Sequence, residues 1–166
     1  HGIATGVANY AGSPIVGVIA ITTDGGETWA QTKLPTDFAS GLTAAVMDPG
    51  KFTVVGQKKD GSFGIFVSLD AGQTWAEKKT SLGSQPMLAM DFPTKTDGYV
   101  TKQCPGPAAL TNDCVLATHD GGQTWAPSTT DCINLRGDVI ACADKDHCFM
   151  AGPPHTSGTQ TIYVTT

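Results

Sequence analysis

Carboxylates, hydroxyls and tryptophans recur together at three places in this chain. The octapeptides are TTDGGETW at 22–29, SLDAGQTW at 68–75 and THDGGQTW at 118–125, and they hold all three tryptophans of the 166 residues. Acidic and aromatic side chains in this combination could bind a sugar or a calcium ion. The alternative is a structural turn, in which a short carboxylate accepts hydrogen bonds from backbone N–H groups nearby. We favour the structural turn.

The structural interpretation gives each repeated position a role. The aspartate accepts backbone hydrogen bonds within the turn, and the first Thr or Ser offers its hydroxyl to the other side of the loop. The glycine adopts a positive φ, and the tryptophan buries its ring between neighbouring units. The expected structural residues are Thr22, Asp24, Gly26, Trp29, Ser68, Asp70, Gly72, Trp75, Thr118, Asp120, Gly122 and Trp125.

Short segments with alternating apolar and β-branched residues surround each octapeptide and predict strands rather than helices. First strands are expected at 41–48, 86–93 and 137–144, and second strands at 51–57, 97–103 and 147–153. Third strands at 64–70, 114–120 and 161–166 follow, and a fourth strand leaves each tryptophan. The first residues, IATGVANYAG, match a second strand, so the chain holds about three and a half units.

Four antiparallel strands in roughly 45 residues are the size of one β-propeller blade. The sequence therefore predicts an all-β fold, a β-propeller of four-stranded antiparallel blades, with blade units at roughly 1–35, 36–80, 81–130 and 131–166. Unpaired edges are usually avoided in proteins. We therefore expect a section of a larger ring, or a chain completed by further blades from the same or another chain. The alternative is a closed ring of four blades with short first and last blades.

The pattern Ser/Thr-x-Asp-x-Gly-x-Thr-Trp resembles the Asp-box, also called the BNR repeat, and all three copies match at every defining position. This repeat occurs in sialidases, xyloglucan-cleaving glycosidases, sortilin-type receptors and photosystem II assembly propellers. The resemblance implies a propeller fold with the Asp-boxes on its periphery. It does not imply an activity, because enzymes and non-enzymes share the repeat.

The sequence does not supply the catalytic residues of either type of glycosidase. Sialidase-like sites imply three arginines, whereas this chain has Arg136 alone, and its only glutamates, Glu27 and Glu77, lie in or beside an octapeptide. A xyloglucanase-like site needs two carboxylates facing a cleft. The residues Asp48, Asp91 and Asp144 instead end equivalent strands, as a repeated turn requires. We expect no catalytic residue in this chain.

All five cysteines lie in the second half of the sequence. Cys104 and Cys114 flank one loop and Cys142 and Cys148 flank another, which predicts two disulfides and an oxidising compartment, extracellular or a lumen. The alternative is buried free thiols. Cys132 is left over.

No cofactor and no metal are expected. The alternative hypothesis is a copper site at His1. An N-terminal histidine can chelate copper through its amino group and ring if a second imidazole lies nearby. The candidates for that imidazole are His119, His147 and His155. The alternative is a processed or accidental terminus. Zinc is disfavoured because the spacing of Cys142, His147 and Cys148 suits a disulfide better.

The net charge of −5 and the scattered lysines offer no basic stripe for nucleic acid, and no apolar run is long enough for membrane insertion. We expect a non-enzymatic, secreted binding or scaffold module that recognises a protein or a glycan. The recognition rim would be formed by the equivalent loops 13–17, 58–64, 104–114 and 153–160. The alternative is a section of a secreted glycoside hydrolase whose catalytic acids lie outside this chain.

Overall fold

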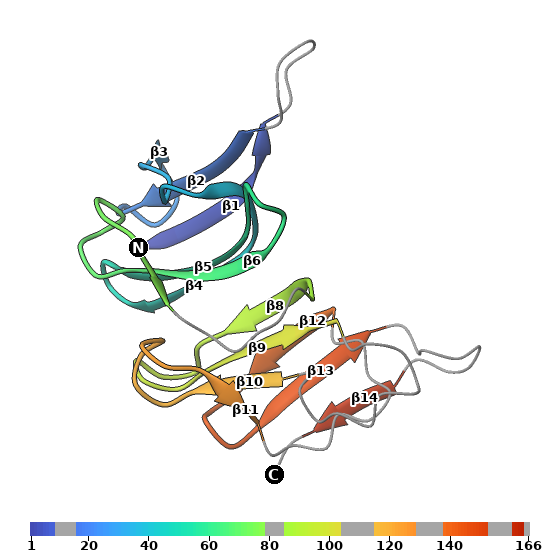
Figure 1. Cartoon of the computed structure of the whole chain (residues 1–166). Coiled ribbons are helices and arrows are strands. Elements are labelled where there is room, and N and C mark those ends of the chain that lie inside the picture. Colours follow the sequence, from blue (N-terminus) through green and yellow to red (C-terminus); the bar gives the residue numbers. More distant parts are fainter. Residues whose placement is uncertain (9–15, 79–84, 104–114, 129–137, 153–160, 165–166) are drawn as a thin grey trace. The chain divides into compact units, whose positions relative to one another are not determined.

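The computed structural model describes residues 1–8, 16–78, 85–103, 115–128, 138–152 and 161–164, and these ranges contain strands and turns but no helix. The predicted all-β class is confirmed. The chain forms two compact units, His1–Thr80 and Ser81–Thr166. Each unit contains two antiparallel sheets (Figure 1). Within the described ranges, no helix is long and apolar enough to cross a membrane.

The first unit contains a three-stranded sheet in the order β1-β2-β3 and a four-stranded sheet in the order β4-β5-β6-β7. Their strands are β1 (Gly2–Ala8), β2 (Val16–Thr22), β3 (Ala30–Gln31), β4 (Phe38–Asp48), β5 (Lys51–Lys58), β6 (Phe63–Ser68) and β7 (Ala76–Lys78). Each octapeptide turn connects the third strand of its repeat to the short strand that follows the tryptophan.

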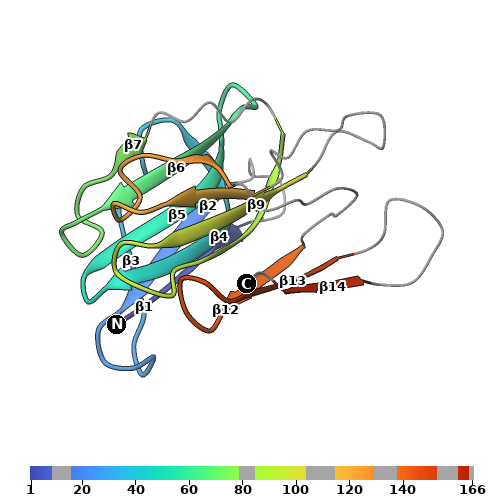
Figure 2. The same cartoon turned by 90° about the horizontal axis from the view of Figure 1, so that it is seen from below.

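The second unit repeats this plan with a four-stranded sheet, β8 to β11 in sequence order, and a three-stranded sheet, β12-β13-β14. The strands are β8 (Met87–Asp91), β9 (Gly98–Lys102), β10 (Val115–Thr118), β11 (Ala126–Pro127), β12 (Val139–Cys142), β13 (Cys148–Gly152) and β14 (Thr161–Val164). Figures 1 and 2 both show β12, β13 and β14 side by side as one sheet.

The strands lie where the sequence predicts them, except that the fourth strands are shorter. Only two or three residues pair in β3, β7 and β11. These strands lie at sheet edges and carry mostly polar or small residues, so little side-chain burial extends the pairing. In β11 the second residue is Pro127, which lacks a backbone N–H. The grouping of the sheets into one propeller domain remains a prediction.

In the first unit, one face of the β1–β3 sheet packs on the β4–β7 sheet. Ile19 joins Phe38, Val54 and Phe66 in a buried cluster, with Ile3 packed against it. Phe38 and Phe66 meet edge to face with ring centroids 5.7 Å apart. Burying each such ring contributes about 2–3 kcal/mol.

Two glycines make room for the Phe38 ring. A Cβ at Gly17 would lie 2.8 Å from this ring, and a Cβ at Gly56 would lie 2.2 Å from it. Any larger residue at either position would displace the aromatic side chain from the cluster.

In the second unit, the β8–β11 sheet packs on the β12–β14 sheet in the same way. Val115 joins Ile140, Cys148 and Met150, with Tyr99 packed against the cluster.

Among the described residues of the second unit, hydrogen bonds also cross between the two sheets. The backbone N–H of Cys142 donates to Asp91 Oδ2 over 2.7 Å, and the Tyr99 hydroxyl donates to the carbonyl of Lys145. Asp91, expected only as a turn residue, therefore fastens one sheet to the next.

The packing gives each sheet two different faces. We call the face that packs on the following sheet the forward face; it carries Ile3 and Ile19 in the first sheet and Tyr99 and Val115 in the third. The face that receives it is the backward face; it carries Val54 and Phe66 in the second sheet, and Ile140 and Met150 in the fourth.

Candidate functional site: the Asp-box turns and the loop at 58–64

Each octapeptide folds into a turn that is closed by its own side chains. In the first turn, Asp24 accepts hydrogen bonds from the backbone N–H of Thr28 at 3.0 and 3.1 Å and from the Thr28 hydroxyl. The hydroxyl of Thr22 donates to Asp24 and accepts from the backbone N–H of Gly26 at 2.9 Å. The carboxylate therefore ties the end of the turn to its start.

The other two turns repeat these contacts. Asp70 and Asp120 each accept from the backbone N–H of the threonine four residues later, at 2.9 Å in both turns. The hydroxyls of Ser68 and Thr118 donate to these carboxylates and accept from the backbone N–H of Gly72 and Gly122, at 2.8 and 2.9 Å.

These hydrogen bonds stabilise the ionised form of each carboxylate relative to the protonated form. Bonds from Thr22 and Thr28 hold the pKa of Asp24 well below its usual range, and bonds from Thr74 lower the pKa of Asp70 to about 2. Partial burial alone would raise the pKa of Asp120, but the bonds from Thr124 and Thr118 outweigh it and lower the pKa to about 2.

The turns need two successive residues with positive φ, not only the one predicted glycine. Gly26, Gly72 and Gly122 have φ of 100°, 81° and 81°, and the preceding residue is also positive in each turn. That preceding residue is Ala71 in the second turn, at 59°, where the left-handed conformation costs a residue with a Cβ about 1–2 kcal/mol.

The three tryptophans are not equivalent. Trp125 is 6% exposed, packs edge to face on Phe92 at 5.8 Å, and donates from Nε1 to the Gly122 carbonyl at 3.2 Å. Trp29 makes the same bond to its own turn at 3.1 Å but is 49% exposed. The expectation that every ring is buried is therefore wrong for Trp29, because its sheet lacks, among the described residues, a first strand equivalent to β8, whose following residue Phe92 covers Trp125.

Trp75 packs against the cluster formed by Phe38, Val54 and Phe66, but its Nε1 is buried without a hydrogen-bond partner among the described residues. The equivalent acceptor would be the Gly72 carbonyl. That carbonyl instead accepts from the hydroxyl of Thr32, which follows β3 of the neighbouring sheet.

A shallow hollow of about 250 Å³ lies beside this contact. It is lined by apolar and uncharged polar residues: Ile21, Thr23, Thr28, Ala30, Gln31, Thr32 and Ala71. The hollow depends on a second octapeptide turn lying beside the first, so no local sequence pattern predicts it.

Cys142 and Cys148 lie opposite each other in β12 and β13 and form a disulfide with a Cα–Cα distance of 4.0 Å. The other predicted pair, Cys104 and Cys114, lies outside the described residues, as does Cys132.

Two histidines of the second unit pair with carboxylates. His119 Nδ1 lies 2.8 Å from Asp97 Oδ1, and His147 Nδ1 lies 2.8 Å from Asp144 Oδ1. A carboxylate that orients an imidazole is part of a general-base pair. Both rings are exposed, however, and both carboxylates also accept hydrogen bonds within their own turns, which supports a structural role.

His1, the copper candidate, is exposed. Within the described ranges, no three His, Cys, Asp or Glu side chains gather as metal ligands. His155 and Arg136 lie outside those ranges. Of the two glutamates, Glu27 is exposed, and Glu77 pairs with Lys58 at 3.0 Å.

The loop between β5 and β6 is the predicted rim segment that the structure describes in full. It is braced by backbone bonds from Lys58 N–H to the Ser62 carbonyl at 2.7 Å and from Gly61 N–H to the Lys58 carbonyl at 3.0 Å. Asp60 accepts from the backbone and the hydroxyl of Ser62 at 2.9 and 2.6 Å, and these bonds lower its pKa.

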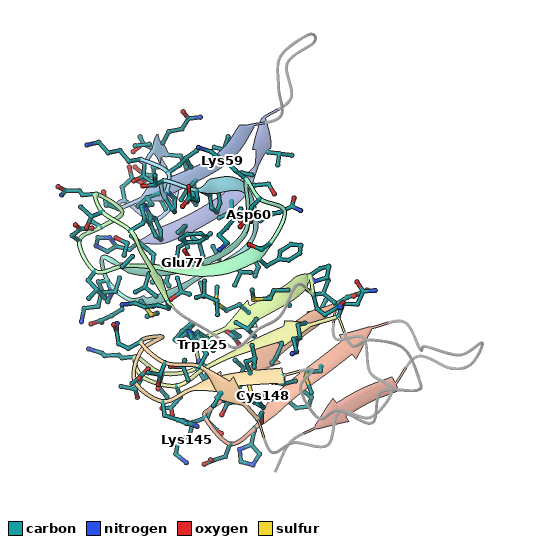
Figure 3. The ribbon with its side chains drawn as sticks, in the orientation of Figure 1. Lys59, Asp60, Glu77, Trp125, Lys145 and Cys148 are labelled. Atoms are coloured by element: carbon teal, nitrogen blue, oxygen red, sulfur yellow. A yellow bond between two sulfur atoms is a disulfide. The ribbon has the colours of Figure 1, made fainter. Side chains whose placement is uncertain are left out.

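The base of the loop is tied to the sheet. The Lys58–Glu77 pair raises the pKa of Lys58, and Lys59 donates from Nζ to the Thr36 carbonyl at 3.0 Å. The side chains of Lys59 and Asp60 remain exposed (Figure 3). The loop thus presents one positive and one negative group on a fixed backbone.

Comparisons with known proteins agree with this geometry. The BNR/Asp-box repeat family matches residues 20–31, which include the first octapeptide turn. A search of curated protein sequences finds no significant match.

Three solved structures share the fold. A GH74 enzyme of Niastella koreensis superposes with a TM-score of 0.64 and 18% identity, over 89% of this chain and 24% of that one. The GH74 xyloglucanase of Xanthomonas campestris has a TM-score of 0.59 and 16% identity, over 90% of this chain and 25% of the enzyme. A Hadza microbial sialidase has a TM-score of 0.57 and 17% identity, over 91% of this chain and 32% of that chain.

The antiparallel sheets, the three octapeptide turns and these fold relatives define a β-propeller. The chain carries the BNR/Asp-box repeat and shares the fold of these β-propellers. It spans 24% and 25% of the length of the two GH74 enzymes.

Proposed function

We propose that this chain is a secreted binding module that recognises a protein or a glycan through loops between the second and third strands of its blades. The observation that carries the proposal is the loop at 58–64, which is braced internally and presents the charges of Lys59 and Asp60. A fixed backbone lowers the entropy cost of binding, because the loop is ordered before the partner arrives.

The roles of the other acidic groups support the same proposal. The carboxylates of the Asp-box turns are each engaged by hydrogen bonds within their own turn. Glu77 is paired with Lys58 at the base of the loop. These groups stabilise the scaffold, and recognition is left to the loops that the scaffold presents. The Cys142–Cys148 disulfide supports a location in an oxidising compartment.

The test is a charge exchange in the loop. The variant Lys59→Glu with Asp60→Lys reverses both charges. It keeps the backbone–backbone bonds of the loop but removes the bonds that Ser62 donates to Asp60. A matched control, Lys145→Glu with Asp146→Lys, makes the same exchange in the exposed turn between β12 and β13. Wild type and both variants are applied to a glycan array, and protein partners are sought by cross-linking and mass spectrometry.

We expect the loop variant to weaken binding by about tenfold or more, because charges that face a partner would be mismatched, and the control to bind as the wild type does. Equal binding by all three proteins contradicts the proposal. The alternative function, a section of a glycoside hydrolase, is tested by incubating the intact natural polypeptide with xyloglucan and with sialylated glycans, and cleavage of either would replace the proposal.

A further inference from the structure

The hollow beside the second Asp-box turn lies between two sheets of the same unit. One side of it comes from β2, β3 and the turn that joins them, and the other side comes from Ala71 in the second turn. Ile21 pairs with Ala30 across β2 and β3, and both lie on the forward face of the first sheet, as Ile3 does. Both sides of the hollow therefore belong to His1–Thr80.

A direct contact between the two sides fixes the shape of the hollow. The Thr32 hydroxyl donates to the Gly72 carbonyl, and a Cβ at Gly72 would lie 2.3 Å from Ile21 Cδ1, so the second turn packs directly on the first sheet. A site held in this way is ordered before a ligand arrives, which lowers the entropy cost of binding. The hollow is also open to solvent, since most of its lining residues are exposed: Thr23, Thr28, Ala30, Gln31 and Ala71.

The residue that forms the far side of the hollow is in an unfavourable backbone conformation. The first and third turns have Gly25 and Gly121 at this position, whereas the second turn has Ala71 with a φ of 59°. A glycine would avoid the cost of a Cβ in the left-handed region. Backbone strain of this kind is concentrated at ligand-binding and catalytic sites.

A second departure from the repeat adjoins the hollow. Trp29 and Trp125 each donate from Nε1 to a glycine carbonyl of their own turn. In the second turn the equivalent Gly72 carbonyl accepts from Thr32, which lines the hollow, and Trp75 Nε1 is buried with no partner among the described residues. A buried polar group without a partner is rare and requires an explanation. Both departures therefore point to a function at the hollow.

The lining residues favour a neutral ligand that donates hydrogen bonds. The described lining contains no charged side chain, so a carboxylate, a phosphate or an ammonium group would find no partner of opposite charge. Thr28 and Thr32 already donate their hydroxyl hydrogens, to Asp24 and to the Gly72 carbonyl. A ligand group that reaches either hydroxyl must therefore donate to it. Neutral hydroxyl groups meet both conditions.

We propose that the hollow between the first and second Asp-box turns binds one neutral sugar ring. A sugar ring carries hydroxyl groups at its edge and C–H groups on its faces. The edge suits the threonines and Gln31, and a face suits the apolar residues Ile21, Ala30 and Ala71. Pockets for drug-sized ligands measure about 300–1,000 Å³, whereas this hollow measures about 250 Å³, which suits a single ring rather than an oligosaccharide.

This sugar site is separate from the loop at 58–64. Strand β6 begins with Phe63 beside the loop and ends with Ser68, where the second turn starts, and six residues of strand span about 20 Å. The hollow and the loop therefore lie at opposite ends of β6. The charge exchange at Lys59 and Asp60 should leave sugar binding at the hollow unchanged, so the two proposals can fail independently.

The experiment titrates the whole isotope-labelled chain with the methyl glycosides of glucose, galactose, mannose and xylose and follows NMR signals. We expect one of these sugars to shift the backbone signals of Gln31 and Ala71 and the indole signal of Trp75, and to leave those of Asp60 and Gly61 unmoved. The Kd should be on the order of 1 mM, because an open hollow covers only one side of the ring. The uronic acid of the sugar that binds should bind at least about tenfold more weakly, since its carboxylate finds no cation in the lining.

The location is tested by filling the hollow. Ala30→Phe places a ring in it and should weaken sugar binding by at least about tenfold. The matched control is Ala76→Phe, because Ala76 follows Trp75 as Ala30 follows Trp29, is exposed at the start of β7 and is not among the described lining residues. Circular dichroism verifies that both variants are folded.

Three results would overturn the proposal. The first is the absence of shifts with all four glycosides at about 100 mM, roughly a hundred times the expected Kd. The second is equal binding by Ala30→Phe and the wild type, or an equal loss in Ala76→Phe. The third is a uronic acid that binds as tightly as the neutral sugar.

Discussion

The second Asp-box turn requires two things of Gly72: a positive φ, and a residue without a Cβ. Replacing Gly72 with alanine tests both requirements. Gly72 has a φ of +81°, and a Cβ there would lie 2.3 Å from Ile21 Cδ1 and 2.9 Å from Thr32 Oγ1. Gly25 in the first turn has a φ of +80°, but a Cβ there would meet nothing within 4 Å. Gly25→Ala is therefore a control with nearly the same φ and no clash.

The expected costs follow from these distances. Gly25→Ala should lower the free energy of unfolding by about 1 kcal/mol, which is the cost of a Cβ at positive φ. Gly72→Ala should cost about 2–4 kcal/mol, because overpacking against Ile21 adds about 1–3 kcal/mol to that backbone cost. Both residues belong to the first unit, so the same unfolding transition reports on both.

The measurement is urea denaturation followed by tryptophan fluorescence, with midpoints compared at equal slope. A Gly72→Ala variant that differs from Gly25→Ala by less than about 0.5 kcal/mol would refute the reasoning, since it would mean that the tight contact with Ile21 contributes nothing.

Three further predictions concern single residues of the turns. Ala71→Gly should stabilise the first unit by about 0.5–1 kcal/mol in the same urea assay, because relief of the positive φ exceeds the entropy cost of glycine. Trp75→Phe should cost about 1 kcal/mol less than Trp125→Phe, as measured by thermal unfolding, because Trp125 Nε1 donates a hydrogen bond to Gly122 whereas Trp75 Nε1 has no partner among the described residues. The pKa of Asp120 is lowered from 3.8 to about 2, so its contribution to stability is present above pH 3.8 and lost as the pH falls toward 2. In acid titrations followed by circular dichroism, an Asp120→Asn variant should lose less stability than the wild type between pH 3.8 and pH 2. If the variant and the wild type show the same pH profile, the lowered pKa of Asp120 does not contribute to stability.

Local patterns in the sequence predicted most of the strands and the residues of the turns. Asp24 and Thr28 are four residues apart, so the chemistry of this contact can be read from eight consecutive letters. The strands follow from alternation over short segments, which is also local.

Features that depend on distant segments could not be predicted in this way. The Thr32 hydroxyl donates to the Gly72 carbonyl across 40 positions of sequence, and Trp75 Nε1 has no hydrogen-bond partner within the part of the chain that the structure describes. The bond from Cys142 to Asp91 spans 51 positions. The exposure of Trp29 depends on which strands lie next to its sheet. None of these contacts has a signal in the octapeptide itself.

The short span of the Asp-box hydrogen bonds has a consequence for folding. The bonds that the backbone N–H of Thr74 donates to Asp70 and that of Gly72 donates to the Ser68 hydroxyl can form as soon as the hairpin turns, before any sheet packs on its neighbour. They fix the alignment of β6 with β7, and a slip of one residue would direct every apolar side chain to the wrong side. In a chain built from similar repeats, strands from different repeats can pair wrongly during folding. Turns that close early on their own residues reduce that risk, so the three octapeptides should speed correct assembly as well as stabilise the finished fold.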